Sequence, residues 1–335
     1  MPRRLLAALA VAVFVAATAF WLRWDGSPPS LGDAAAAVVE SGVPGVIVRL
    51  RDGDDVRELA KGEASVNDRF RIASVTKTFV AALTLDLARL GILSLDDTAA
   101  DFEPGLVSDA EEITIRELLS HRAGLFDYTS DPALLRGQLD PRALIGIADG
   151  KPRTEGYAYS STNYLILGLV VQRAGLAALD AMLDRQILEP YRLADTTFEP
   201  GTVDGPHLHG HERPLRDGIA TGSLKDTSER TARSAWAAGA MVSTAADLDR
   251  FFTRLLASEL GQRMRPKGDE RYGLGLARFE TGCGPVVGHT GNLLGMLTVV
   301  WSREDRLLVV AANVYPVTPE QETKLRLLLE RAFCG

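Results

Sequence analysis

The chain contains little cysteine, and its basic residues are not gathered anywhere along its 335 positions. Two cysteines exclude a disulfide-rich scaffold and a four-cysteine zinc site, and they allow one bridge at most. Lys and Arg number 37 against 44 Asp and Glu, and no stretch collects the cations that phosphates attract, which argues against nucleic acid as a partner. Internal repeats are also lacking. The 46% of hydrophobic and 24% of charged residues are typical of a globular enzyme or binding protein.

Residues 1–24 predict export, either as a signal peptide or as a membrane anchor. Arg3 and Arg4 precede an uncharged apolar run from Leu5 to Leu22. The small residues Ala17-Thr18-Ala19 offer a cleavage site, whereas the apolar and aromatic character continues up to Arg23, as in an uncleaved anchor. Both interpretations place the rest of the chain outside the cytoplasm, secreted or held at the membrane through this segment alone.

The two cysteines are predicted to form a disulfide. Outside the cytoplasm thiols oxidise, so Cys283 and Cys334 are most simply interpreted as one bridge. Such a bridge would tie the last residues of the chain to the body of the protein.

Strand patterns lie at both ends of the chain and helical patterns lie between them. We predict one antiparallel sheet built from residues of about 43–70 and 272–335, covered by the terminal helices, with a mostly helical lobe of about residues 75–270 inserted. The fold class is therefore α/β in the broad sense (α+β), within a domain of residues 34–335. Strands are predicted at residues 43–50, 57–61, 285–288, 296–301 and 307–314, and helices at 75–90, 114–120, 163–174, 176–187, 245–257 and 319–333.

The first candidate for chemistry is a serine followed three residues later by a lysine, where a short extended piece opens a helix. Ser74 and Lys77 would lie on one helical face within hydrogen-bond reach. A serine hydroxyl needs a base to attack, and a lysine serves as one if burial and a positive helix terminus lower its pKa. Alone, the pattern also fits a helix cap and a surface lysine. The scarcity of lysine, the apolar helix and two companion motifs favour an activated nucleophile.

The second motif is a tyrosine-rich loop, residues 156–164, that leads into an apolar helix. Tyr159 is the candidate second base, because a phenol beside an ammonium group can have its pKa lowered enough to shuttle a proton. In isolation such a segment is more often a packing element.

The third motif is Gly288-His289-Thr290-Gly291-Asn292, where a strand is predicted to begin. Small residues at a strand edge let a substrate pair with the backbone, and His289 and Thr290 would add donors for a carboxylate or for proton transfer. A bend in the strand is the structural alternative. With His289 in this position, we expect acylation to depend on pH near the imidazole pKa of about 6.5.

Other histidines carry weaker signals. His207, His209 and His211 alternate on a segment with Gly and Pro neighbours, which indicates a surface loop, and only Glu212 is a nearby carboxylate. We therefore predict no metal site and no cofactor. His121 precedes a glycine-containing turn and is predicted to be a structural hydrogen-bonding residue.

The order Ser74-x-x-Lys77, Tyr159-x-Ser161 and His289-Thr290-Gly291 resembles the motifs of the penicillin-binding and class C β-lactamase superfamily of serine hydrolases. The likeness covers roughly residues 34–335 and extends to the secreted actinobacterial D-alanyl-D-alanine carboxypeptidases. It implies an antiparallel sheet flanked by helices, with the active site between sheet and lobe. Further similar segments are residues 118–128 (LLSHRAGLFDY), 236–251 (WAAGAMVSTAADLDRF), 272–276 (YGLGL) and 331–335 (RAFCG).

The resemblance implies a role for each matching residue. Ser74 would be acylated, Lys77 would tune or deprotonate it, and Tyr159 would relay protons with His289 nearby. The backbone N–H groups of Ser74 and Asn292 would form the oxyanion hole. The implied substrate is a peptidoglycan-type peptide, a β-lactam or a small ester. The enzyme itself is expected to be a monomer. The implied substrate-binding residues are Ser161, Trp236, Thr290, Gly291 and Asn292.

The sequence also departs from the family pattern. Ser161 stands where the family usually has Asn, and Asn292 stands where the carboxypeptidases commonly have Thr. Ala277 aligns with an Arg that helps to hold the substrate's terminal carboxylate, with Arg278 beside it. Acyl transfer is still expected, but carboxypeptidase, β-lactamase and esterase stay open as activities. An inactive, membrane-anchored penicillin sensor is the alternative of another class, and the complete Ser-Lys-Tyr set favours the enzyme.

Overall fold

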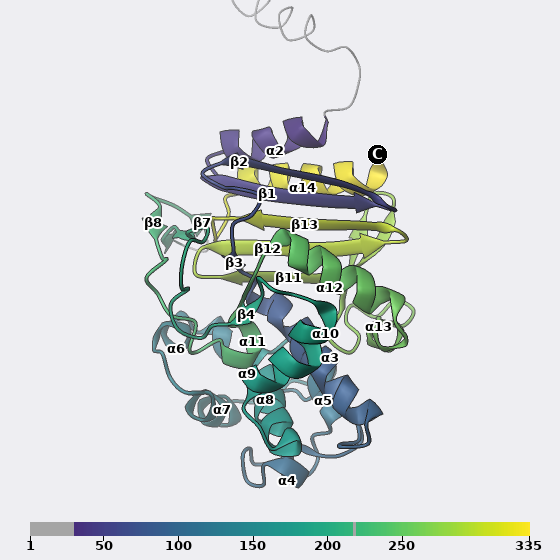
Figure 1. Ribbon diagram of the computed structural model, residues 1–335. Helices are drawn as coiled ribbons and strands as arrows, with labels where there is room; N and C mark the ends of the chain where they lie inside the picture. The colour runs from purple at the N-terminus through teal and green to yellow at the C-terminus, as the bar shows by residue number, and fades with distance from the viewer. Residues whose placement is uncertain (1–29, 217–218) are drawn as a thin grey trace, which may run out of the picture.

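The computed structural model describes residues 30–216 and 219–335, and the predicted signal peptide or anchor at residues 1–24 lies outside them (Figure 1). A six-stranded sheet runs in the order β10-β11-β12-β13-β1-β2, with every neighbouring pair antiparallel. Its strands are β1 (Gly45–Asp52), β2 (Asp55–Gly62), β10 (Ala277–Thr281), β11 (Gly284–Leu293), β12 (Met296–Arg303) and β13 (Arg306–Ala312). Strands from both ends of the chain meet where Val46 of β1 lies opposite Ala312 of β13, which confirms the predicted sheet.

Helices cover both faces of this sheet. The helices are α2 (Leu31–Glu40), α3 (Thr76–Arg89), α4 (Ala99–Phe102), α5 (Ile115–Leu119), α6 (Pro132–Arg136), α7 (Pro141–Asp149), α8 (Ser161–Gly175), α9 (Leu179–Leu183), α10 (Glu189–Tyr191), α11 (Trp236–Gly239), α12 (Ala245–Ala257), α13 (Glu259–Met264) and α14 (Pro319–Cys334). Helices α2 and α14 lie together on one face, and α12 and the helical lobe lie on the other (Figure 1). Short strands complete the lobe: β3 (Phe70–Arg71), β4 (Thr197–Phe198), β5 (His211–Glu212), β6 (Leu215–Arg216), β7 (Ile219–Ala220), β8 (Lys225–Asp226) and β9 (Met241–Ser243).

The strand sequences explain why the sheet is buried on both sides. Successive side chains of a strand point to opposite faces, so a strand covered on both faces is apolar at nearly every position. In β13, Leu307 and Val309 join the core shared with the lobe, whereas Leu308 and Val310 join the core shared with α2 and α14. The lobe therefore stands against one face of the sheet, and their junction is where a substrate cleft can form.

Helix α3 is the central element of the lobe. Nearly all of its residues from Thr76 to Leu87 are buried, because it packs against α8, α11 and α13. Phe79 stacks on Phe251 of α12 with ring centroids 3.9 Å apart. A residue at the N-terminus of α3 is therefore held firmly by packing on all sides.

Several elements differ from the sequence prediction. The helix predicted at residues 176–187 is wrong as a single element, because α9 ends at Leu183 and continues as a π-helical segment, Asp184–Leu188, before α10. Helix α2 is not among the predicted helices, and Ser30 and Asp33 form the reciprocal cap that starts it. Helices α6 and α7 and the exposed edge strand β10 were also not predicted.

In the part of the chain that the structure describes, no single helix has both the length and the apolar character of a membrane span. Helix α8 and the segment Leu179–Tyr191 have the length and apolar character of a span only when they are taken together, and they are bent by 75° relative to each other.

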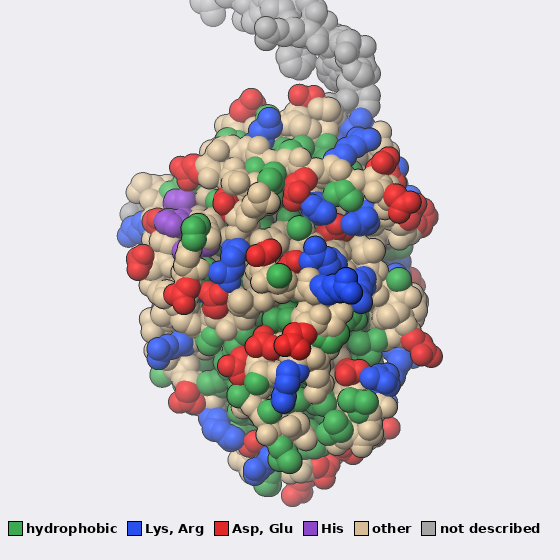
Figure 2. All heavy atoms as spheres, in the orientation of Figure 1, with side chains coloured by type: hydrophobic (Ala, Val, Ile, Leu, Met, Phe, Trp, Pro, Cys, Tyr) green, Lys and Arg blue, Asp and Glu red, His purple; other side chains and the backbone are tan. Residues whose placement is uncertain are grey.

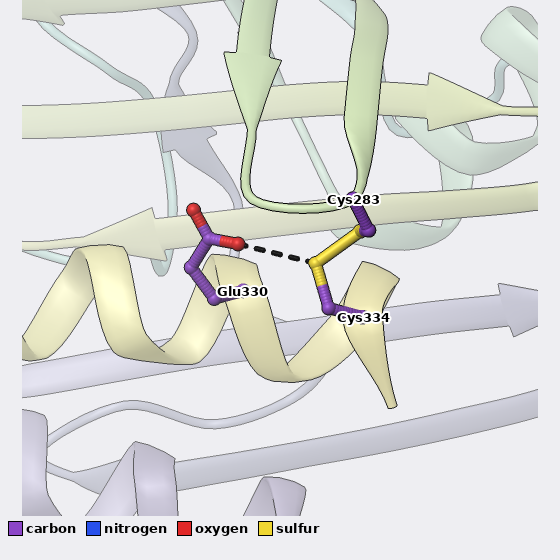
Figure 3. A group of neighbouring side chains, drawn as sticks. All are labelled: Cys283, Glu330 and Cys334. Atoms are coloured by element: carbon purple, nitrogen blue, oxygen red, sulfur yellow. Dashed lines mark hydrogen bonds between the residues drawn. A yellow bond between two sulfur atoms is a disulfide. The ribbon is translucent and has the colours of Figure 1, made fainter.

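The predicted disulfide between Cys283 and Cys334 is confirmed (Figure 3). It joins the turn between β10 and β11 to the C-terminal end of α14. Glu330 lies beside it, with a carboxylate oxygen 3.1 Å from Sγ of Cys334 and 2.9 Å from the backbone nitrogen of Gly282, which donates to it. The bridge therefore fastens the terminal helix to the strand pair at the edge of the sheet.

Replacing both cysteines by serine is expected to lower the free energy of unfolding by about 4 kcal/mol, the chain-entropy value for a loop of this length. For a chain of this size the melting temperature should fall by on the order of 8 °C. Thermal unfolding of the oxidised protein and of the double variant measures the change. A reductant should lower the melting temperature of the wild type and leave that of the variant unchanged, and equal melting temperatures of the oxidised wild type and the variant would contradict the expectation.

Candidate active site

A single tight turn presents Ser74. Strand β3 ends at Arg71, residues Ala73–Val75 form one 3₁₀ turn, and α3 begins at Thr76. Ala73 has a φ of 48°, a left-handed conformation that costs a non-glycine residue free energy and recurs at functional sites. The backbone nitrogen of Ile72 donates to Met241 of β9 (3.0 Å), and the Thr298 hydroxyl of β12 donates to the Arg71 carbonyl (3.1 Å). Two sheets thus hold the turn in place.

Lys77 lies fully buried beneath Ser74. Its Nζ donates to Oγ of Ser74 over 3.0 Å and to the backbone carbonyl of Ala238 over 2.8 Å. Burial lowers the pKa of Lys77 to about 7, and the carboxylate of Asp127 partly opposes that shift. At neutral pH a large share of this lysine is therefore an uncharged amine, which can accept the proton of the Ser74 hydroxyl.

Tyr159 lies in contact with this pair. Nζ of Lys77 is 5.3 Å from the centre of its ring. The predicted lowering of the Tyr159 pKa is wrong: burial raises it well above its usual range, although the Ser74 hydroxyl acts in the opposite direction. Lys77 supplies little stabilising charge because it is itself half neutral near pH 7. Tyr159 is therefore a protonated phenol that can donate a hydrogen bond to a substrate.

His289 is buried and neutral. Its Nδ1 lies 2.6 Å from the Thr290 carbonyl and must donate to it, so Nε2 accepts a hydrogen bond from the Tyr272 hydroxyl over 2.9 Å. Burial first, and then the charge of Lys77, lower the pKa of His289 to about 3. The expected pH dependence near 6.5 from this histidine is therefore wrong, because the ring stays uncharged between pH 5 and 8.

His121 packs against the ring of Tyr159 and is hydrogen-bonded to the backbone next to it. It accepts a hydrogen bond from the backbone nitrogen of Ser160 at Nδ1 (3.2 Å), which agrees with the predicted structural role. Its ring lies 4.2 Å from that of Tyr159 and 4.5 Å from that of Tyr272. Burial lowers the pKa of His121 well below its usual value, so this packing involves a neutral ring.

These residues open into one cleft of about 570 Å³ between the lobe and β11. Asp127 and Tyr272 belong to the site, but the sequence analysis did not select them. Asp127 follows the His121 turn and Tyr272 precedes β10, so no local motif joins them to Ser74. The lining includes the predicted residues Ser74, Tyr159, Ser161, His289, Thr290 and Asn292, together with Asp127, Tyr128, Tyr157, Tyr272 and Ala277.

Two of the predicted substrate-binding residues do not line the cleft. Trp236 packs on α8, where a Cβ added to Gly168 would lie 2.6 Å from the indole ring. Gly291 faces the nucleophile turn, since a Cβ added to it would lie 2.3 Å from the Ile72 carbonyl oxygen and 2.7 Å from the Ser74 nitrogen. The absence of a side chain at Gly291 lets β11 contact the turn that carries Ser74.

Replacing Gly291 by alanine is expected to lower the rate of Ser74 acylation by about 100-fold, the typical cost of displacing a reacting group by about 1 Å. The rate of labelling by a fluorophosphonate probe measures the effect. Gly146→Ala is the matched control, because a Cβ at that position of α7 meets no atom within 4 Å. An unchanged labelling rate in a folded Gly291→Ala variant would show that the close contact does not position Ser74.

The alternating histidines lie elsewhere, beside the end of β13, where His211 pairs with Val314 and its backbone nitrogen donates to the Asn313 carbonyl (3.1 Å). His side chains gather beside the sheet in Figure 2. They line a small cavity with Glu63, Asp68 and Asp226, and Nδ1 of His209 lies 3.0 Å from a carboxylate oxygen of Asp226. Over residues 30–216 and 219–335, ligand atoms of three metal-binding side chains converge only at Cys283, Glu330 and Cys334, where the sulfurs form the disulfide. The histidines therefore do not form a ready metal site.

Comparison with known proteins adds three findings. The family model described as Beta-lactamase matches residues 31–332. Penicillin-binding protein 4 of Amycolatopsis lactamdurans is 32% identical over 239 residues, which cover 63% of this chain and 59% of that protein. The solved structure of a D-stereospecific amidohydrolase from Streptomyces sp. is similar with a TM-score of 0.80 and 28% identity, over 92% of this chain and 99% of that one. The D-amino acid amidase of Ochrobactrum anthropi SV3 shares the fold (TM-score 0.77, 23% identity, 90% and 98% covered).

Proposed function

Since the chain belongs to the beta-lactamase family of serine hydrolases, we propose that Ser74 attacks the carbonyl of an amide bond and that water then hydrolyses the acyl-enzyme. One observation carries the proposal: Nζ of Lys77, with a pKa of about 7, lies 3.0 Å from Oγ of Ser74. A buried amine in this position has no role in a binding module, whereas a nucleophile requires it.

In the proposed acylation step, the residues around Ser74 have distinct roles. The neutral amine of Lys77 takes the proton of Ser74 as Oγ bonds to the carbonyl carbon, and the carbonyl electron pair moves onto oxygen. The backbone N–H groups of Ser74 and Asn292 stabilise that oxyanion. The Tyr159 hydroxyl protonates the leaving nitrogen as the C–N bond breaks, and the proton held by Lys77 returns to Tyr159. Deacylation repeats the sequence with a water molecule in place of Ser74.

For the substrate, we propose peptides of the D-alanyl-D-alanine type from the cell wall, cleaved as by a carboxypeptidase. The penicillin-binding relative and the D-stereospecific amidohydrolase support this class, and penicillins should acylate Ser74. The predicted export segment favours action outside the cytoplasm. A β-lactamase or an esterase of the same family would use the same first step.

A D-amino acid amidase is the second candidate. Ala277 lines the cleft where the carboxypeptidases have an Arg that holds the terminal carboxylate. Among the described residues of the lining, no Arg or Lys replaces that cation. A substrate that leaves as ammonia or as a neutral amine needs no such partner.

Intact mass spectrometry over time, after mixing with a penicillin, a D-Ala-D-Ala peptide or a D-amino acid amide, tests the proposal. A lasting adduct on Ser74 together with release of D-Ala supports the carboxypeptidase. Rapid loss of penicillin without an adduct supports a β-lactamase, and release of ammonia alone supports the amidase. No adduct and no turnover of these compounds or of a simple ester would contradict the proposal and favour the inactive sensor.

A further inference from the structure

Three histidine side chains line a second cavity, which is separate from the substrate cleft. Its volume is about 270 Å³, and none of the residues that line it also lines the cleft. His207, His209 and His211 alternate along one segment, so their side chains lie on the same side of it. Figure 2 shows that histidine side chains gather at the surface of the molecule, where solutes can reach them. The proposed reaction uses none of these residues and does not explain the cluster.

The hydrogen bonds of two of these rings determine which nitrogen carries the proton. Nδ1 of His207 lies 2.9 Å from the Gly205 carbonyl oxygen, and Nδ1 of His209 lies 3.0 Å from a carboxylate oxygen of Asp226. Hydrogen bonds, first that from the Ser228 backbone nitrogen, lower the pKa of Asp226 to about 2. Neither oxygen can donate, so each Nδ1 carries the proton and each neutral ring keeps a lone pair on Nε2. Metal-binding histidines have this arrangement: one ring N–H donates to a carbonyl or carboxylate, and the other nitrogen binds the ion.

Nε2 of His207 is buried and has no hydrogen-bond partner among the described residues. An unpaired buried acceptor is unfavourable, and in a native protein it requires a partner such as a water molecule or an ion. The ring of His209 is 52% exposed, and its centre lies 5.0 Å from that of His207. The ligand atoms of the cavity do not yet converge on one point, so binding of an ion requires this exposed ring to rotate toward His207.

The carboxylates of the cavity come from segments that are distant in the sequence. Glu212, the carboxylate next to the histidines, is engaged elsewhere, because it accepts from the Arg230 guanidinium over 2.5 Å. Neither Lys nor Arg lines the cavity among the described residues. At neutral pH several negative charges therefore lie beside the imidazoles, and this environment favours a divalent cation. The carboxylates of the lining are Glu63, Asp68 and Asp226.

Asp68 is the carboxylate best placed to bind an ion together with His207. Backbone pairing joins Arg69, the next residue, to His207, and the Leu208 nitrogen donates to the Arg69 carbonyl (2.8 Å). One carboxylate oxygen of Asp68 accepts from the Ser65 backbone nitrogen (2.8 Å), which holds the side chain in place and leaves its second oxygen to bind an ion. The fold thus supplies a nitrogen and an oxygen ligand from two neighbouring segments.

We propose that His207, His209 and Asp68 form a binding site for Zn²⁺, in which Asp226 holds His209 in the binding orientation. The ion would join the segment of residues 207–211 to the connection between β2 and β3. Imidazole nitrogens suit Zn²⁺ and its neighbours Ni²⁺ and Cu²⁺, whereas Mg²⁺ and Ca²⁺ prefer oxygen ligands. Because the site shares no lining residue with the cleft, the ion stabilises the folded protein and takes no part in the reaction.

Thermal unfolding of the protein without an affinity tag, after treatment with a chelator, tests the proposal. Zn²⁺ at about 100 times its dissociation constant should raise the melting temperature by roughly 5 °C, and Mg²⁺ should leave it unchanged. Calorimetric titration should give one bound ion per chain. His207→Gln or His209→Gln should remove the thermal shift, and Asp226→Asn should weaken the affinity by about 10- to 100-fold.

The matched control is Glu330→Gln. Glu330 lies beside the disulfide, at the other point where potential metal ligands converge, and its replacement should leave the effect of zinc unchanged. Melting temperatures measured without zinc show whether each variant keeps its fold. His209 and Asp226 are both about half exposed, so their replacement should be tolerated.

The rate at which a fluorophosphonate labels Ser74 separates this site from the substrate cleft. Zinc bound at the proposed site should leave that rate unchanged. If zinc slows labelling and the thermal shift persists in His209→Gln, the ion binds in the cleft and the proposed site is wrong. Absence of a thermal shift and of binding heat with Zn²⁺ would also overturn it. Labelling in the absence of metal reports on the nucleophile separately, so neither result bears on the proposed hydrolysis.

Discussion

Replacing Ser74 by alanine is expected to abolish covalent labelling by penicillins and fluorophosphonates and to lower amide hydrolysis by about 10⁴-fold or more. The cleft then lacks the atom that forms the acyl bond, and the remaining N–H groups act only on bound substrate. Because Ser74 is half-buried and its hydroxyl is hydrogen-bonded to Lys77, the fold should survive the change. Intact mass after incubation with each probe measures labelling, and a thermal scan checks the fold.

Ser41→Ala provides the control for this variant. Ser41 follows α2 on the opposite face of the sheet, and its hydroxyl donates to the Val38 carbonyl (2.6 Å), so labelling should proceed as in the wild type. An adduct that still forms on a folded Ser74→Ala variant would show that another residue is the nucleophile.

The acylation rate is expected to rise with pH through a midpoint near 7, because only the uncharged form of Lys77 can take the Ser74 proton. Below that pH the lysine is protonated and acylation slows about tenfold per pH unit. Lys77→Met, which suits a buried position, should lower the rate by about 10³-fold and remove the rise. The second-order rate of labelling by a neutral probe between pH 5.5 and 9 measures the profile.

His289→Asn separates the two groups that could produce such a profile. The pKa of His289 is lowered to about 3, so its replacement should reduce the rate without moving the midpoint. A midpoint that shifts in His289→Asn, or that persists in Lys77→Met, would assign the titration to a group other than Lys77.

The sequence correctly predicted those helices and strands that are defined by their own residues, through a cap or a regular apolar spacing. Helix α12 spans Ala245–Ala257, the range predicted, because Thr244 caps it and its apolar residues recur at helical spacing. The helix predicted from residue 176 begins only at Leu179, because Leu176 takes a left-handed conformation that the apolar pattern around it does not reveal. Edge strand β10 was missed as well, because it is only five residues long and three of them are the polar residues Arg278, Glu280 and Thr281.

In the site, too, local sequence patterns identified some residues, whereas others are brought in only by tertiary packing. Three short motifs were enough to select Ser74, Lys77 and Tyr159, because chemistry requires those residue types at those spacings. The pKa values of Tyr159 and His289 depend on burial by distant segments. The lowered pKa predicted for Tyr159 and the ordinary imidazole pKa assumed for His289 were therefore both wrong. Asp127 and Tyr272 reach the cleft from loops far apart in the sequence, and Trp236 turns toward α8 through packing that only the tertiary structure defines.

The pairing of β1 with β13 has a consequence for the order of folding. The hairpin β1–β2 is complete after residue 62, but its second neighbour is made only at residues 306–312. Until then β1 has an unpaired edge, and the turn of Ser74 lacks the Thr298 hydroxyl that holds Arg71. Contacts of such large sequence separation form slowly. During synthesis, competence for acylation should therefore appear only after nearly the whole chain has been made.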